Sequence, residues 1–123
     1  MKVKITKLAN HMDHIIRPDD SQIVVTAGIN LPVLIGMGTT VVIPTGIKIS
    51  LPEGHIGLLS IDPLLSLNSN VSLVNGITIL DSESTGEVVL GLVNNKYTSF
   101  SVNPGDIIGT IHIIKTATIK IEG

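Results

Sequence analysis

Short runs of Val, Ile and Leu, each closed by a turn-forming residue, constrain the fold of this chain more than any other feature. The runs have strand length and are bounded by Gly, Pro, Asn or Asp. β-Branched side chains fit a pleated, half-buried surface. Many short strands separated by turns are typical of an all-β sandwich or barrel. The expected strands cover residues 1–8, 23–25, 31–35, 39–43, 47–51, 55–61, 71–74, 77–80, 87–94, 99–102 and 107–121.

Turn signals divide these runs. Pro44-Thr45-Gly46 and Pro52-Glu53-Gly54 both predict tight turns. A single helical turn fits residues 63–67, and no stretch shows a sustained helical period. At 123 residues, the chain is expected to be one domain, residues 1–123.

Composition argues against a nucleic-acid partner. The net charge is −2, aromatic residues make up 2% of the chain, and no Lys or Arg lies between Lys48 and Lys96. Binding to DNA or RNA needs clustered cations for the phosphates and aromatic rings for the bases. The chain has no cysteine, which excludes disulfides and thiolate metal sites.

We expect neither a protein-held metal site nor a membrane anchor. His11 and His14 have the spacing of one helical face, but no carboxylate-rich cluster accompanies them, so we interpret them as solvated loop residues. The longest apolar runs are too short to span a bilayer, and no signal peptide is evident. These features predict a soluble, intracellular chain, in the cytoplasm or associated with a virion.

The order and spacing of the turns resemble the motifs of the trimeric dUTPase family. The matching segments are residues 42–57, 63–67, 81–87 and 104–108. The resemblance implies a distorted jelly-roll β-barrel that assembles as a homotrimer, with sites at the subunit interfaces. It also implies a magnesium-dependent pyrophosphatase acting on dUTP, if the site residues are in place.

Two of the matching motifs have lost charged or polar groups. Ala27-Gly28-Ile29-Asn30-Leu31 carries the neutral Asn30 where the family has an Asp that holds the magnesium-triphosphate through water. In Pro63-Leu64-Leu65-Ser66-Leu67, Leu64 and Leu65 replace the phosphate-binding Arg and Ser. Ser66 is one position late and offers a single hydrogen bond. Leucine has no donor for the charge-assisted contact that a phosphate requires.

The third motif keeps one candidate catalytic carboxylate. Asp81 falls on the position of the family's water-activating Asp, although an Asx-turn in this Ser-rich loop is the alternative reading. Ser84 replaces the Tyr that packs on the deoxyribose, and Asn75 falls near a position that contacts uracil. In the fourth motif, Ile107 and Thr110 replace Arg and Gln, and Asp106 is expected to be a turn residue. The Gly-rich arm of the fifth motif is not found.

The replaced residues led to one main hypothesis and two alternatives. Each charge-assisted bond is worth about 1.5–3 kcal/mol, so losing several predicts a catalytically inactive homotrimer with a structural, protein-interaction or regulatory role. Leu64, Leu65 and Ile107 would then be packing surface. The alternatives are an active, magnesium-dependent dUTP pyrophosphatase and a module that binds a nucleotide or other small ligand in the old cleft. The candidate nucleotide-binding positions are Asn75, Ser66, Ser84 and Thr110, and Asp81 is the only catalytic candidate.

Overall fold

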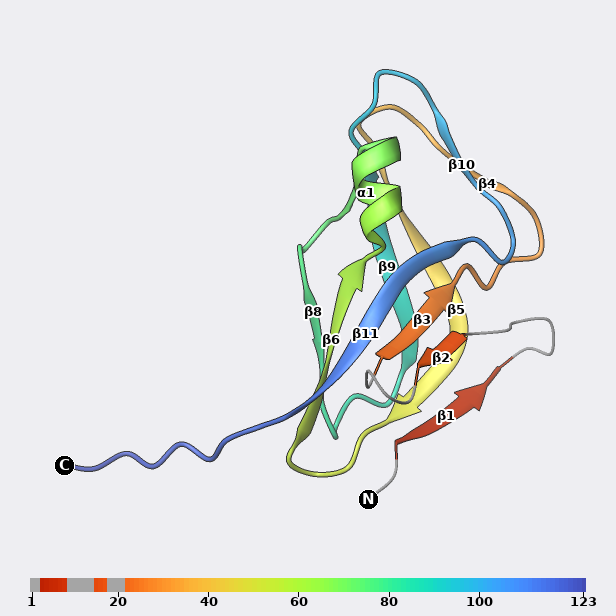
Figure 1. The fold of residues 1–123 in the computed structure, drawn as a ribbon. Coiled ribbons are helices and arrows are strands. Elements are labelled where there is room, and N and C mark those ends of the chain that lie inside the picture. The colour runs from red at the N-terminus through yellow and green to blue at the C-terminus, as the bar shows by residue number, and fades with distance from the viewer. Residues whose placement is uncertain (1–2, 9–14, 18–21) are drawn as a thin grey trace.

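The computed structural model describes residues 3–8, 15–17 and 22–123, and the fold within them is mostly β-sheet (Figure 1). A four-stranded sheet has the order β1-β5-β9-β7, a five-stranded sheet has the order β2-β3-β11-β6-β8, and β10 pairs with β4. All of these pairings are antiparallel. The elements are β1 Lys4–Lys7, β2 Ile15–Arg17, β3 Gln22–Thr26, β4 Val33–Ile35, β5 Thr40–Ser50, β6 His55–Ile61, α1 Pro63–Ser69, β7 Val71–Leu73, β8 Thr78–Leu80, β9 Glu87–Asn94, β10 Phe100–Val102 and β11 Ile107–Lys115.

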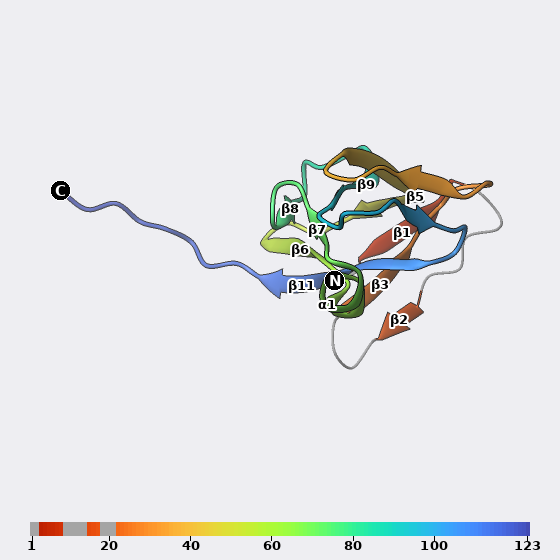
Figure 2. The ribbon, with the colours of Figure 1, turned by 90° about the horizontal axis from the view of Figure 1, so that it is seen from above.

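The two larger sheets pack face to face around an aliphatic core. Figure 2 shows β5 and β9 lying over β3 and β11. Alternate residues of β9 point inward, so that Val88, Leu90 and Leu92 are buried. This is the period of two expected for a strand with one face on the core. The predicted all-β class is therefore confirmed.

The prediction of a tight turn at Pro44-Thr45-Gly46 is wrong. These residues lie inside one eleven-residue strand, β5, and the register with β9 shifts between Pro44 and Lys48. The Thr45 hydroxyl donates to the Val88 carbonyl at 2.6 Å, and the Gly46 amide donates to Glu87 Oε2 at 2.9 Å. Gly46 has a φ of 75°, which glycine adopts without strain. The turn signal therefore marks a β-bulge.

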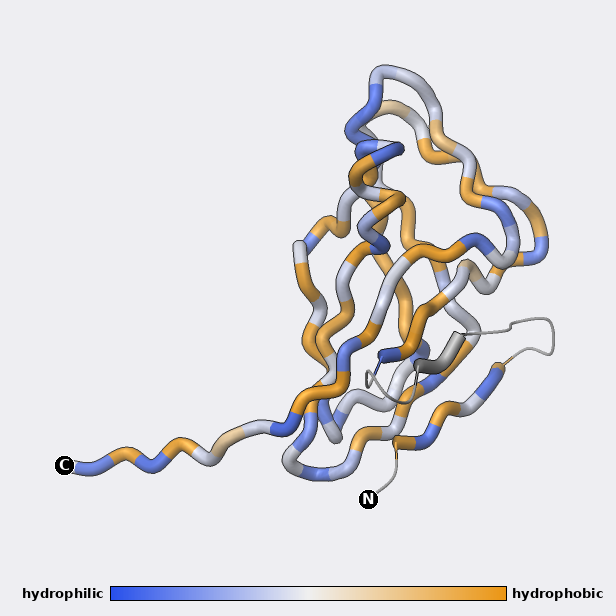
Figure 3. Tube along the Cα trace, in the orientation of Figure 1, coloured by the Kyte–Doolittle hydropathy of each residue, from blue (hydrophilic) through white to orange (hydrophobic). Residues whose placement is uncertain are grey.

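The helix and the last strand differ in length from the ranges expected from the sequence. The helix α1 extends to Ser69, beyond the single turn expected over residues 63–67. The last strand ends at Lys115, and residues 116–123 are exposed and continue away from the sheets. Apolar and polar residues alternate along this segment (Figure 3). The predicted turn at Pro52-Glu53-Gly54 is confirmed, since the His55 amide donates to the Pro52 carbonyl at 3.2 Å.

Candidate functional site

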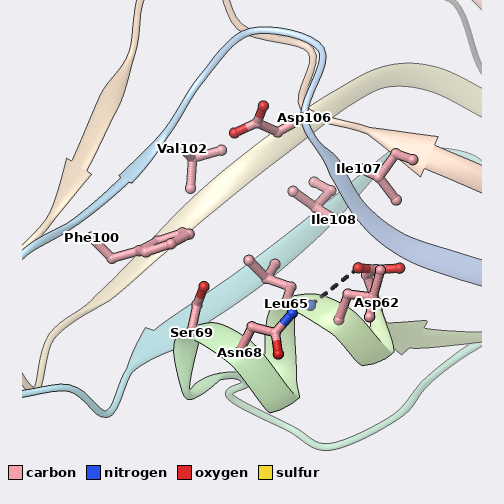
Figure 4. A pocket seen from close by; sticks show the side chains of 10 residues that line it. Asp62, Leu65, Asn68, Ser69, Phe100, Val102, Asp106, Ile107 and Ile108 are labelled. Carbon is pink, nitrogen blue, oxygen red and sulfur yellow. Dashed lines mark hydrogen bonds between the residues drawn. The ribbon is translucent and has the colours of Figure 1, made fainter.

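A cavity of about 290 Å³ opens between α1, β10 and the start of β11 (Figure 4). Figure 4 shows Leu65 directed from α1 toward the space beside Phe100 and Ile108. Six of the ten residues that line the cavity are apolar. The lining residues are Asp62, Leu64, Leu65, Asn68, Ser69, Phe100, Val102, Asp106, Ile107 and Ile108.

Local sequence fixes the helix that presents two of these residues. Asp62 is the N-cap of α1, and its Oδ2 accepts the Leu65 amide at 3.1 Å. Pro63 occupies the first turn, where its missing N–H costs nothing. Asn70 ends the helix in the left-handed region, with a φ of 52°. Together the two caps orient Leu64 and Leu65.

A second cavity, of about 440 Å³, adjoins the first. Leu64 and Ile107 line both, and Thr110 lines the second. The structure therefore places Leu64, Leu65, Ile107 and Thr110 in one region. Ser66 is half-buried in α1 and lines neither cavity. The second cavity is lined by Gln22, Val24, Ser60, Asp62, Pro63, Leu64, Ile107, Thr110 and His112.

The charge in this region is negative. Asp62 lines both cavities and Asp106 lines the first, while none of the described lining residues is Lys or Arg. The Asp106 side chain accepts the Asn103 amide at 2.8 Å, which confirms its expected role in a turn. A triphosphate bound here would therefore need positive charge from another source.

The described residues do not form a magnesium site on their own. Among residues 3–8, 15–17 and 22–123, no group of three or more His, Asp or Glu side chains is placed to hold a metal ion. Asn30 is exposed and neutral. In phosphate-binding sites of proteins, magnesium is usually bound through substrate phosphate oxygens and water as well as one or two carboxylates. His11 and His14 lie outside the described residues.

Asp81 lies in a tight turn directly after β8. The Glu83 amide donates to Asp81 Oδ1 at 3.0 Å, which is the Asx-turn considered from the sequence. The Ser84 hydroxyl donates to the same Oδ1 at 3.2 Å. Within the described part of the chain, Oδ2 has no hydrogen-bond partner. The carboxylate is thus held by one oxygen and offers the other to solvent.

Asp81 and the first cavity lie toward opposite ends of β6. Leu80 pairs with Gly57 near the start of β6, whereas α1 follows the last residue of that strand, Ile61. A strand of seven residues is about 20 Å long. A single chain therefore does not bring Asp81 and Ser84 together with Leu64 and Ile107.

Asn75 occupies the other end of β8. Thr78, the first residue of β8, pairs with Leu59 near the end of β6. The Asn75 side chain is exposed and donates to the Thr78 hydroxyl at 2.8 Å. It is therefore on the side of β8 away from Asp81, and it lines neither cavity.

Several residues of the cavities were not predicted as site residues. Phe100 and Val102 reach the first cavity from β10, and Gln22 and His112 reach the second from β3 and β11. Nothing in the local sequence marks them. Asp62 did carry a signal, because Asp followed by Pro is a typical start of a helix.

The packed antiparallel sheets place this chain in an all-β class, with the short helix α1 after β6. The family model described as dUTPase matches residues 23–122, so the chain belongs to the dUTPase family. Solved dUTPase structures confirm the predicted dUTPase-like fold. A mutant dUTPase from phage phi11 of S. aureus matches with a TM-score of 0.86 at 16% identity, covering 100% of this chain and 96% of that one. The native EIAV dUTPase matches with a TM-score of 0.80 at 16% identity, covering 99% and 95%.

Curated relatives are closer in sequence. The deoxyuridine 5'-triphosphate nucleotidohydrolase of Dictyoglomus turgidum is 32% identical over 92 residues, which cover 75% of this chain and 63% of that protein. The protein of the same name from Finegoldia magna is 34% identical over 78 residues, covering 63% and 54%. This chain thus spans less than two thirds of the length of these relatives.

These relatives contradict the hypothesis of a catalytically inactive protein. Proteins 32–34% identical to this chain are named as nucleotidohydrolases, which favours the alternative of an active enzyme. The hypothesis assumed that phosphate charge must be balanced by side chains at Leu64 and Ile107. In the single chain these residues are 66% and 41% exposed, and they line open cavities.

In the described chain, no helix has the length and apolar content to cross a membrane.

Proposed function

We propose that this chain is a dUTP nucleotidohydrolase that converts dUTP to dUMP and pyrophosphate. The observation that carries the proposal is Asp81, a carboxylate retained at the family's water-activating position and held in a defined turn. Family membership and the names of the curated relatives support the substrate.

In the proposed reaction, Asp81 orients a water molecule through its unpartnered Oδ2 and accepts its proton. The water oxygen forms a bond to the α-phosphorus of dUTP. The bond from that phosphorus to the oxygen bridging to the β-phosphorus breaks, and pyrophosphate leaves. A general base contributes typically about 10²–10⁴-fold to such a step.

We also infer that the working site is shared between copies of the chain in a homotrimer. Asp81 and the first cavity, which holds Leu64, Leu65 and Ile107, are separated by most of the length of β6, so one chain supplies only one half of each site. A second copy can place its Asp81 turn beside that cavity. Light scattering coupled to size exclusion should give three times the chain mass of 13.0 kDa, and a stable monomer would contradict the shared site.

Magnesium is the cation that we expect to accompany the substrate. The cavities contain Asp62 and Asp106 but have no Lys or Arg among their described lining residues. When bound to the triphosphate, magnesium would neutralise phosphate charge. Ser66, Asn75 and Thr110 stay candidate nucleotide-binding residues, and Thr110 is the one that lines a cavity.

The direct test is pyrophosphate release from dUTP in the presence of magnesium. Asp81→Asn keeps the size of the side chain and removes the base, so turnover should fall by about 10²-fold or more. Glu83→Gln is the matched control, because it removes an exposed charge from the same loop while the Glu83 amide still donates to Asp81. Turnover that survives Asp81→Asn, or an inactive parent protein, would overturn the proposal.

A further inference from the structure

We propose that Ser84 is a positioning residue that holds the Asp81 carboxylate for catalysis, rather than a residue that contacts the nucleotide. This inference rests on the proposed function, because it assigns Ser84 a task through Asp81. It replaces the sequence-based interpretation in which Ser84 is a nucleotide-binding residue.

Both hydrogen-bonding functions of the Ser84 hydroxyl are used within the turn. The hydroxyl donates to Asp81 Oδ1 at 3.2 Å and accepts the Asp81 amide at 3.1 Å. The Ser84 amide donates to the Asp81 carbonyl at 3.1 Å, which closes the turn. A serine hydroxyl has one proton to donate, and here that proton is committed to Asp81.

The same contacts give the two oxygens of the Asp81 carboxylate different surroundings. Oδ1 receives the Ser84 hydroxyl and the Glu83 amide, while Oδ2 has no partner in the described chain. Two donors on one oxygen fix the rotation of the carboxylate plane and leave Oδ2 to face a water molecule. Ser84 is half-buried whereas Asp81 is exposed, so the less exposed residue anchors the more exposed one.

Substitutions at Ser84 separate positioning from substrate binding. Ser84→Ala removes the hydroxyl, and we expect kcat to fall about ten- to hundred-fold, since a misplacement of about 1 Å can cost about 10²-fold. KM for dUTP should stay within about twofold, because an interaction that acts only in the transition state lowers kcat alone. Ser84→Thr keeps the hydroxyl and should restore most of kcat.

Two controls make the effect specific. Ser82→Ala removes an exposed hydroxyl from the same loop that has no hydrogen-bond partner in the described chain, and it should leave kcat unchanged. In the Asp81→Asn background, adding Ser84→Ala should cause little further loss, because residues that act as a unit are not additive.

A readout independent of activity tests the contact itself. In amide hydrogen exchange by NMR, Ser84→Ala should accelerate exchange at the Glu83 amide, which shares Oδ1 with Ser84, and Ser82→Ala should not. An active enzyme whose kcat and Glu83 exchange are both unaffected by Ser84→Ala would overturn this inference and leave the proposed function standing. A rise in KM alone would also overturn it, by returning Ser84 to nucleotide binding. A parent protein without dUTP hydrolysis would overturn the proposed function and the catalytic role of Ser84 together.

Discussion

The buried amide of Asn94 is bonded to the backbone carbonyl of Ile35, with Nδ2 donating at 2.9 Å. The same nitrogen donates to the Thr98 carbonyl at 2.8 Å, and Oδ1 accepts the Lys96 amide at 2.9 Å. Asn94 thus joins the end of β9 to β4 and to the loop that leads into β10. Phe100 of β10 forms part of the first cavity, so Asn94 also supports the wall of the candidate site.

Replacing Asn94 with Ala should lower the free energy of unfolding by about 2–4 kcal/mol. The substitution leaves buried or partly buried backbone groups without partners, each at a cost of about 1–3 kcal/mol. Asn95→Ala is the matched control, because the exposed Asn95 side chain bonds only to the Ser72 hydroxyl among the described residues. Thermal melting of both variants measures the difference. Equal melting temperatures would show that the Asn94 bonds contribute little.

Gly109→Ala should also destabilise the protein, for a steric reason. A Cβ on Gly109 would lie 2.8 Å from the Ser60 carbonyl oxygen and 2.9 Å from Leu90 Cδ2. The oxygen belongs to the backbone of the paired strand β6, so it cannot move aside freely, and overpacking typically costs about 1–3 kcal/mol. Gly86→Ala meets nothing within 4 Å and should be close to neutral. Chemical denaturation of the two variants tests this contrast.

Much of the fold was predictable because turn residues punctuate the sequence. The strands β6 and β9 match the expected ranges, since Gly and Pro before β6 and Gly86 before β9 stop the preceding structure. The bulge at Gly46 was not predictable, because Pro-Thr-Gly has the composition of a turn. Whether this segment forms a turn or a bulge depends on its hydrogen bonds to Val88 and Glu87 of the partner strand, which lie far away in sequence.

The candidate site was predictable where a motif marks it. Leu64, Ile107 and Thr110 come together as their motif positions suggested. Phe100 reaches the same region through the pairing of β10 with β4, and local sequence does not encode that contact. The hypothesis of inactivity, which the curated relatives contradict, equated missing arginines with missing phosphate binding. A cation or a second copy can also supply charge.

Leu64→Arg should strengthen the binding of dUTP. Leu64 occupies the position of the family's phosphate-binding Arg, is 66% exposed, and lines both cavities. A charge-assisted bond of about 1.5–3 kcal/mol would lower KM by about tenfold or more. Leu67→Arg adds the same charge to the same helix at a residue that is 81% exposed and lines neither cavity, so KM should change little. Equal effects of both variants would indicate general electrostatic attraction.

Mixing two inactivated chains should restore activity if each site is shared between copies. Asp81→Asn removes the base, and Ile107→Asp places a carboxylate in the cavities where phosphate is expected, so each variant alone should be poorly active. After joint unfolding and refolding, mixed assemblies contain sites with an intact Asp81 from one copy and an intact Ile107 from another. Pyrophosphate release should then recover to a measurable fraction of the parent rate. A mixture of Asp81→Asn with Asp81→Ala is the control, because every site in it lacks the base. Mass spectrometry of the intact assemblies verifies mixing, and mixed assemblies without recovered turnover would show that one chain holds a complete site.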